Sequence, residues 1–147
     1  MAKTKYAGKG SFVECELDPV GSPDTWTKFG YTESITPPPR SRAKVEATNL
    51  DEVMVNLEPG IEEDSEFVFV QVWDPADADD KAIDTLFDSA AKLPWRITYP
   101  TLPNPTEDVF SGWVSGIAPD TIDVGTRIGR SVTITRTSTI VRTTATP

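Results

Sequence analysis

Residues 108–120 read DVFSGWVSGIAPD, and this stretch is the strongest guide to the fold of the chain. Aromatic and β-branched residues alternate there with small and hydroxyl-bearing ones, a pattern typical of a β-strand. Gly112 and Gly116 interrupt the pattern, and a glycine inside a strand marks a β-bulge or the close approach of another backbone. The stretch contains no catalytic motif, so we expect it to build structure rather than to perform chemistry.

Strands are predicted on both sides of this stretch. The segment WRITY at 95–99 alternates between an inward and an outward face, and a long final strand covers 128–137. In the final strand, Ile128, Val132 and Ile134 share one face. The opposite face is uncharged and mostly hydroxyl-bearing; it consists of Gly129, Ser131, Thr133, Thr135 and Thr137.

The most clearly predicted strand is 65–73, SEFVFVQVW. It is apolar on both faces, so we expect other parts of the protein to pack on both of them. A helix predicted at 74–92 supplies one cover. Asp74 is placed as its N-cap and Pro75 at its first position. The apolar stripe of this helix recurs at three- and four-residue spacings and consists of Ile83, Leu86, Phe87, Ala90 and Ala91.

Two further strands are predicted near the N-terminus, at 11–17 and 26–35, and the turn cluster between them makes them a hairpin. The segment TPPPR at 36–40 ends the second strand, because proline has no N–H to donate. From residue 36 to 64 we expect a long loop with one short strand at 43–47. A loop of this length inside a compact domain is commonly functional or disordered.

Together these elements predict a mainly β fold: a β-sandwich or partial barrel with one flanking α-helix and a long inter-strand loop. The 147 residues suffice for a single domain, with its core at about 6–137. The polar tail at 138–147 is expected to stay mobile until something orders it.

Charge and composition exclude several classes of function. The net charge is −9 with no histidine, and such an acidic surface repels nucleic acid. The single cysteine, Cys15, cannot form an internal disulfide and suits a reducing, cytoplasm-like compartment. The N-terminus has no apolar segment of a signal peptide, and no apolar run is long enough to span a membrane, so we expect no membrane partner.

The charges are also unevenly distributed along the chain. Residues 45–80 contain twelve acidic side chains and no Lys or Arg, whereas residues 1–10 contain three Lys and no acid. Residues 121–147 contain four Arg against one Asp. The chain therefore has basic ends and an acidic middle, an asymmetry that suits contacts between copies.

No catalytic, cofactor-binding or metal-binding residue is predicted. Without histidine, most nucleophile–base pairs and transition-metal sites are excluded. Carboxylates are so abundant that a chance pair carries no information. The acidic run at 74–80 lacks the Gly and Glu of a calcium loop and is typical of a helix N-terminus.

The chain resembles the tail tube proteins, or major tail proteins, of long-tailed bacteriophages, chiefly the non-contractile type. The resemblance runs from about residue 6 to 137. It depends on the order and spacing of soft motifs, from ITPPP through VEATNLDEV, LEPGIEED, FVFVQVWDPADADDKAIDTLFDSA and WRITYP to FSGWVSGI and SVTITRT. One departure is that we expect no immunoglobulin-like domain of the kind that some members carry after the last strand.

The resemblance implies a structural virion protein, made in the bacterial cytoplasm, whose hexameric rings stack into a tube that DNA traverses without specific binding. Tape measure, tail terminator and tip proteins are then its other partners. The loop at 36–64 becomes the inter-ring stacking loop, with candidate contacts Pro37, Pro38, Pro39, Arg40, Arg42, Lys44, Asp51, Glu52, Glu58, Glu62, Glu63 and Asp64. Ser131, Thr133 and Thr135 are candidates to line the lumen. The basic ends that would face the acidic loop of a neighbouring ring are represented by Lys3, Lys5, Lys9, Arg136 and Arg142.

Three alternatives remain open at this point. A tail terminator or another ring-forming tail protein would share the fold and cap a tube. A free β-sandwich module could hold carbohydrate through exposed tryptophans, although most of the tryptophans alternate as core residues. An acidic hydrolase would rest on chance carboxylates.

Overall fold

The computed structural model describes residues 3–5, 7–48, 50 and 54–144. One sheet has the strand order β2-β1-β7-β8-β9-β6-β3, with β10 added on β8, and a second sheet is the hairpin β4-β5. The strands and the helix are β1 (Phe12–Cys15), β2 (Thr27–Phe29), β3 (Thr32–Thr36), β4 (Arg42–Glu46), β5 (Leu57–Glu62), β6 (Ser65–Val72), α1 (Ala78–Ser89), β7 (Leu93–Tyr99), β8 (Thr106–Pro119), β9 (Gly129–Arg136) and β10 (Val141–Thr144).

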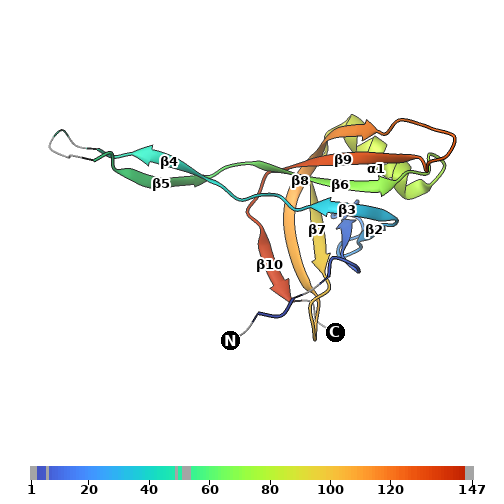
Figure 1. Cartoon of the computed structure of the whole chain (residues 1–147), viewed down its shortest axis with the longest axis horizontal. Coiled ribbons are helices and arrows are strands. Elements are labelled where there is room, and N and C mark those ends of the chain that lie inside the picture. The colour runs from blue at the N-terminus through green and yellow to red at the C-terminus, as the bar shows by residue number, and fades with distance from the viewer. Residues whose placement is uncertain (1–2, 6, 49, 51–53, 145–147) are drawn as a thin grey trace.

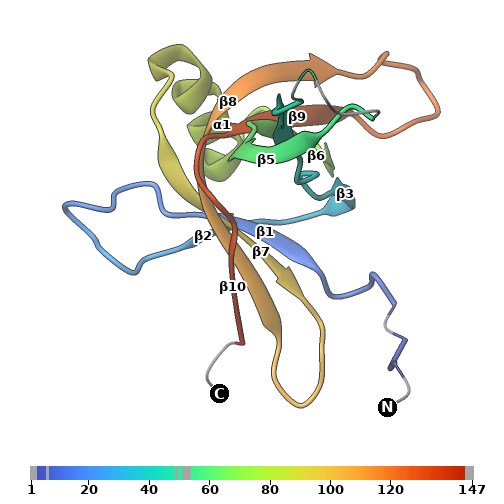
Figure 2. The same ribbon diagram turned by 90° about the vertical axis from the view of Figure 1, so that its left-hand side faces the viewer.

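The long strand β8 divides the sheet into two parts that face each other. Its first half pairs with β7 and β10, and its second half pairs with β9. The register shifts between Val114 and Gly116, which confirms the bulge predicted from the glycines. The sheet therefore folds over as a partial barrel, with β8-β9-β6-β3 in one part and β2-β1-β7 in the other (Figures 1 and 2). The predicted mainly β fold is confirmed.

Gly112 shows why the crossing of β8 and β9 needs a glycine. A Cβ at this position would lie 2.7 Å from the carbonyl oxygen of Thr135 and 2.8 Å from a methyl group of Ile134. A Cβ at Gly116 would only touch Thr133, at 3.7 Å. The predicted close approach of two backbones is therefore found at Gly112.

The core lies between the two parts of the sheet and under α1. Aromatic rings form its centre, with the ring centroids of Phe67 and Phe110 5.3 Å apart and those of Phe29 and Trp95 5.8 Å apart. The other members are Val13, Cys15, Phe69, Ile83, Leu86, Ile97, Val114, Val132 and Ile134. Burial raises the pKa of the Cys15 thiol to about 12, so this cysteine is an unreactive core residue.

The helix is shorter than predicted. Asp77, not Asp74, is its N-cap, because the Asp77 backbone is extended and its carboxylate accepts from the N–H of Asp80. The Asp74 carboxylate instead accepts from the N–H of Ala76 in the preceding turn. The helix ends before Ala90, which adopts a left-handed conformation with φ 53°. It is also too short to cross a membrane, as far as the described residues go.

Three predicted boundaries were wrong. The strand expected at 26–35 is split into β2 and β3 at Tyr31, whose φ is 56°, so the second piece leaves β1 and pairs with β6. The short strand expected at 43–47 is confirmed as β4, but the expected loop at 36–64 also contains β5, which pairs with β4 to form a β-hairpin. In the tail, residues 141–144 form β10 against β8, because their backbone groups complete the open side of that strand.

Candidate assembly surfaces

The hairpin of β4 and β5 projects from the rest of the chain as an arm, defined here as residues 41–63 (Figure 1). Within the described part of the chain, its strands pair only with each other. An isolated two-stranded hairpin is marginally stable in water. The arm nevertheless exposes large apolar side chains at 53–81% of their surface: Val45, Met54, Val55, Leu57 and Ile61. Such a surface is typical of a segment that another molecule covers.

Arg136, at the end of β9, anchors the base of the arm. Although it is charged, it is only 2% exposed, because the alternation of β9 places it on the apolar face of the strand. Its guanidinium contacts the chain on both sides of the arm and the segment that leads to β10. The hydrogen-bond acceptors are Glu62 Oε1 at 3.0 Å, Ser65 Oγ at 2.9 Å, Ser138 O at 2.8 Å, Glu63 O at 3.2 Å and Pro39 O at 3.4 Å.

Glu62 also accepts hydrogen bonds from a second arginine at the base of the arm. Arg40 donates to both of its carboxylate oxygens, at 3.0 and 3.1 Å. The hydrogen bonds and positive charge of Arg40, helped by those of Arg136, lower the pKa of Glu62 from 4.5 to about 2. The Arg42 guanidinium adds a bond across the hairpin to the carbonyl of Gly60, at 2.7 Å. The base of the arm is therefore held by charge-assisted hydrogen bonds, which are stronger than neutral ones.

The structure places most of the predicted stacking residues on or beside the arm, where they are accessible. Pro38 is buried and Glu62 is partly buried by its two arginines. Asp51 and Glu52 lie outside the described residues. The exposed members are Pro37, Pro39, Arg40, Arg42, Lys44, Glu58, Glu63 and Asp64. Their contacts with another copy stay a prediction.

The predicted basic ends divide into two groups. Lys3, Lys5 and Lys9 are exposed. Arg136 and Arg142 are already engaged within the single chain: Arg136 with Glu62, as described above, and Arg142 with the buried carboxylate of Asp108. The two Arg142 bonds are 2.7 and 2.9 Å long. The pairing of a basic end with the acidic segment thus occurs inside the chain for Arg136, whereas a contact between copies remains a prediction.

An open face lies on the side of the sheet away from the core and α1. The register places Val70 opposite Ser131, Val68 opposite Thr133, and Glu66 and Trp113 on either side of Thr135. We call this set of side chains of β6, β8 and β9 the open face. Ser131, Thr133 and Thr135 are half-buried on it, and Glu66 is its one charged member. The open face therefore carries apolar, hydroxyl and acidic groups but no positive charge.

Two strand edges of this part of the sheet are unpaired. Over the described residues, β3 pairs only with β6, and β8 beyond Gly112 pairs only with β9. These two edges border the four-stranded part on opposite sides, with β8 at its upper margin and β3 at its lower margin in Figure 1. Unpaired edges are templates for pairing with another chain.

A buried polar network fixes α1 beside the β8 edge. Arg130, which is fully buried, donates to Asp84 Oδ1 and to the carbonyl of Asp80, each at 2.9 Å. Gln71 donates to the Asp80 carboxylate at 2.7 Å. The sequence prediction did not single out Arg130, and it assigned Arg136 to a basic end rather than to the core. Both residues alternate in step with Val132 and Ile134, one before and one after them, which places them on the core face.

Comparison with known proteins shows to which family the chain belongs. Residues 6–141 match the family described as lambda phage tail tube protein. This match covers more than half of the chain and agrees with the resemblance found in the sequence. Among curated protein sequences, none matches.

Several solved structures share the fold at low sequence identity. The tail of an empty gene transfer agent particle, determined with C6 symmetry, has a TM-score of 0.74 at 12% identity, over 95% of this chain and 99% of that one. The SPP1 tail tube has a TM-score of 0.73 at 9% identity, over 97% and 81%. The sheath/tube terminator of an extracellular contractile injection system has a TM-score of 0.73 at 10% identity, over 97% and 99%.

Proposed function

The chain belongs to the lambda phage tail tube protein family and is a structural component of a tail tube in a virion, and on this premise we propose how its copies assemble. Copies form closed rings, six to a ring, and the rings stack into the tube through which DNA passes. The six-fold count is supported by the C6 symmetry of the gene transfer agent tail, which has the same fold.

Within a ring, the unpaired edge of β3 in one copy meets the unpaired edge of β8 in the next. Both edges have free backbone groups, and they border the same four-stranded part on opposite sides. A head-to-tail contact of this kind closes into a ring when the rotation between copies fits. Ring closure then removes both edges from solvent, which protects the assembled copies from uncontrolled edge-to-edge aggregation.

Between rings, the arm is the stacking element. Its exposed apolar side chains and its weak intrinsic stability are the observations that carry this proposal. The loop between β8 and β9 lies at the opposite end of the molecule, and it exposes Ile122 at 69% and Val124 at 110% (Figure 1). Rings stacked in one direction bring the arm of one copy toward this end of a copy in the next ring, where apolar groups of both are covered.

The open face lines the lumen. Positive side chains there would attract phosphate and retain DNA, whereas the open face combines hydroxyl and apolar groups with the acid Glu66. Ser131, Thr133 and Thr135 are then the lumen residues of β9. The tape measure protein, terminator and tip proteins complete the tail, and assembly takes place in the host cytoplasm.

The test is a chain with a shortened arm. Residues 44–59 are replaced by Asn-Gly, which joins Ala43 to Gly60 through a tight hairpin turn and keeps Arg40, Arg42 and Glu62. We expect this variant to fold and to form rings, seen by negative-stain microscopy, but no tubes. Tubes of normal length from the shortened chain would refute the stacking role. Single rings from the full-length chain would favour a terminator instead.

A further inference from the structure

Phe87 is only partly covered in the single chain. It lies in the last turn of α1, next to Leu86, which is 8% exposed, yet Phe87 is 46% exposed. The sequence pattern placed it in the apolar stripe of the helix together with Ile83 and Leu86, and the structure buries only those two. A large aromatic side chain at the margin of a helix is typical of an anchor for another molecule.

The helix that carries Phe87 lies against β8, whose second half has an unpaired edge. The helix packs against β8, and Arg130 holds it there through Asp84 and Asp80. The C-terminal end of α1 and the second half of β8 lie together at the upper margin of the molecule in both overall views (Figures 1 and 2). A copy that approaches the β8 edge therefore also meets the last turn of α1.

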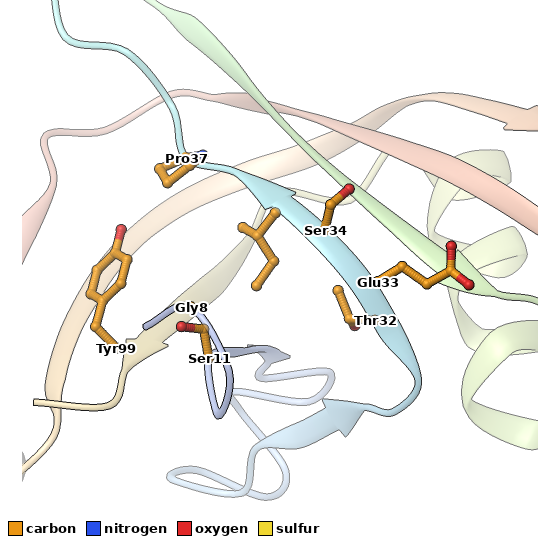
Figure 3. Close-up of a pocket in the computed structure, with 8 residues that line it drawn as sticks. Gly8, Ser11, Thr32, Glu33, Ser34, Pro37 and Tyr99 are labelled. Atoms are coloured by element: carbon orange, nitrogen blue, oxygen red, sulfur yellow. The ribbon is translucent and has the colours of Figure 1, made fainter. Parts of the chain in front are cut away.

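A groove lies beside the other unpaired edge. It has a volume of about 420 Å³ and is lined mainly by carbon atoms. Figure 3 shows it between β3, which contributes Ser34, and the side chains of Ser11 and Tyr99 on the opposite wall. Burial and the neighbouring Asp108 raise the pKa of Tyr99 to about 12, and its hydroxyl donates to Asp108 at 3.1 Å. The Tyr99 ring is thus held in a fixed, neutral position at the wall.

We propose that Phe87 of one copy fills the groove beside β3 of the next copy in the ring. The inference rests on the proposed ring assembly and names a side-chain anchor for it. The occupant is a second copy of the chain, because the anchor and the groove accompany the two unpaired edges on opposite margins of the same sheet. When one edge meets the other, a head-to-tail contact brings the groove to Phe87 in every interface of the ring.

The anchor also gives the ring a specificity that backbone pairing lacks. A β-strand edge accepts any other edge, and its register can slip by two residues without loss of hydrogen bonds. An aromatic side chain in a groove of fixed position selects one register and one partner. Phe87 is therefore expected to set the alignment of neighbouring copies as well as their affinity.

The first test measures the critical concentration for tube formation. Phe87→Ala is compared with Phe87→Leu and with Val20→Ala, a change at a residue that is 92% exposed in the loop after β1. Because Phe87 contributes little to the core of the single chain, circular dichroism and thermal unfolding should match the wild type. We expect Phe87→Ala to raise the critical concentration at least tenfold, Phe87→Leu to raise it less, and Val20→Ala to leave it unchanged.

The second test measures whether the last turn of α1 in one copy lies near β3 of the next copy, with Phe87 left unchanged. Asp88→Cys and Ser34→Cys are combined, and a short bis-maleimide reagent is applied to assembled protein. Cys15 is buried and does not compete. We expect a ladder of linked copies that ends at the full ring on a denaturing gel, whereas Asp88→Cys with Val20→Cys should give no ladder.

The two tests separate this inference from the proposed function. If wild-type protein forms tubes but gives no ladder, the Phe87 contact is overturned. The same holds if Phe87→Ala assembles at the critical concentration of the wild type. Either outcome would leave ring stacking intact. If wild-type protein forms no rings or tubes at all, the proposed assembly itself fails.

Discussion

Arg136 Nη1 lies 3.0 Å from Glu62 Oε1, and this ion pair joins the strand that carries the open face to the base of the arm. The same guanidinium reaches the backbone of Pro39 and Glu63, so it holds both legs of the hairpin where they leave the sheet. The direction of the arm is therefore fixed by a residue of β9. The open face and the base of the arm are therefore joined by one side chain.

Replacing Arg136 should release the arm and weaken the fold. Arg136→Ala removes five hydrogen bonds and leaves the buried acceptors around it unsatisfied. We expect a loss of unfolding free energy of about 3 kcal/mol, measured by urea denaturation. Arg40, whose side chain is 54% exposed, is the matched control, and Arg40→Ala should cost clearly less because water screens an exposed ion pair. Equal losses for the two variants would contradict the anchoring role of Arg136.

The ion pairs of Glu62 with its two arginines should stabilise the base of the arm less at acidic pH. The folded-state pKa of Glu62 is lowered from 4.5 to about 2, mainly by Arg40, so the ionised form is favoured in the folded chain. The stabilisation is complete above pH 4.5 and is lost as the pH falls toward 2. The protection factors of the arm amides, which are normalised to the intrinsic exchange rate at each pH, should fall in this window in the wild type, while Glu62→Gln should be poorly protected throughout. Wild-type protection that stays constant from pH 6 to pH 2.5 would refute this.

The two glycines of β8 should differ in their tolerance of alanine. A Cβ at residue 112 would overlap the backbone of Thr135, and relief requires β8 and β9 to separate. We expect Gly112→Ala to lower the free energy of unfolding by about 1–3 kcal/mol. Gly116→Ala adds only an ordinary contact with Thr133 and should be nearly neutral. A neutral Gly112→Ala would show that the strands do not approach this closely.

Positive charge on the open face should slow the passage of DNA. Ser131 and Thr133 are changed to Arg together, and genome ejection from reconstituted particles is followed with a DNA-binding dye. Phosphate attraction should reduce the ejection rate, more strongly at low salt, while tube assembly stays normal. The control changes Ser22 and Thr25, which are exposed in the loop after β1 and outside the open face, to Arg. Unchanged ejection kinetics would remove β9 from the lumen.

The sequence predicted the parts of the fold that depend on local pattern. Alternation identified β6, β7 and β9 within one or two residues, and the glycines of the 108–120 stretch indicated the bulge and the close strand approach. These signals are local because side-chain alternation and the missing Cβ act on immediate neighbours.

The parts that the sequence did not predict depend on contacts between distant residues. The arm was expected as a loop with one short strand at 43–47, because its segment is rich in charged residues and contains proline, although the pairing of β4 with β5 orders both strands. Arg130 and Arg136 are charged residues in the core, and only their tertiary partners Asp84 and Glu62 explain their burial. In the sequence, Phe87 belongs to the apolar stripe of the helix. In the structure, α1 packs against β8 so that Ile83 and Leu86 are buried and Phe87 is not. The contacts of the stacking, lumen and basic-end residues between copies stay predictions.

The most direct test of the account is electron microscopy of the purified full-length chain over a range of concentrations, beside the chain with the shortened arm. We predict hollow tubes from the full-length chain above a critical concentration and rings that do not stack from the shortened one. A full-length chain that stays monomeric at every concentration, or a shortened chain that still builds tubes, would contradict it.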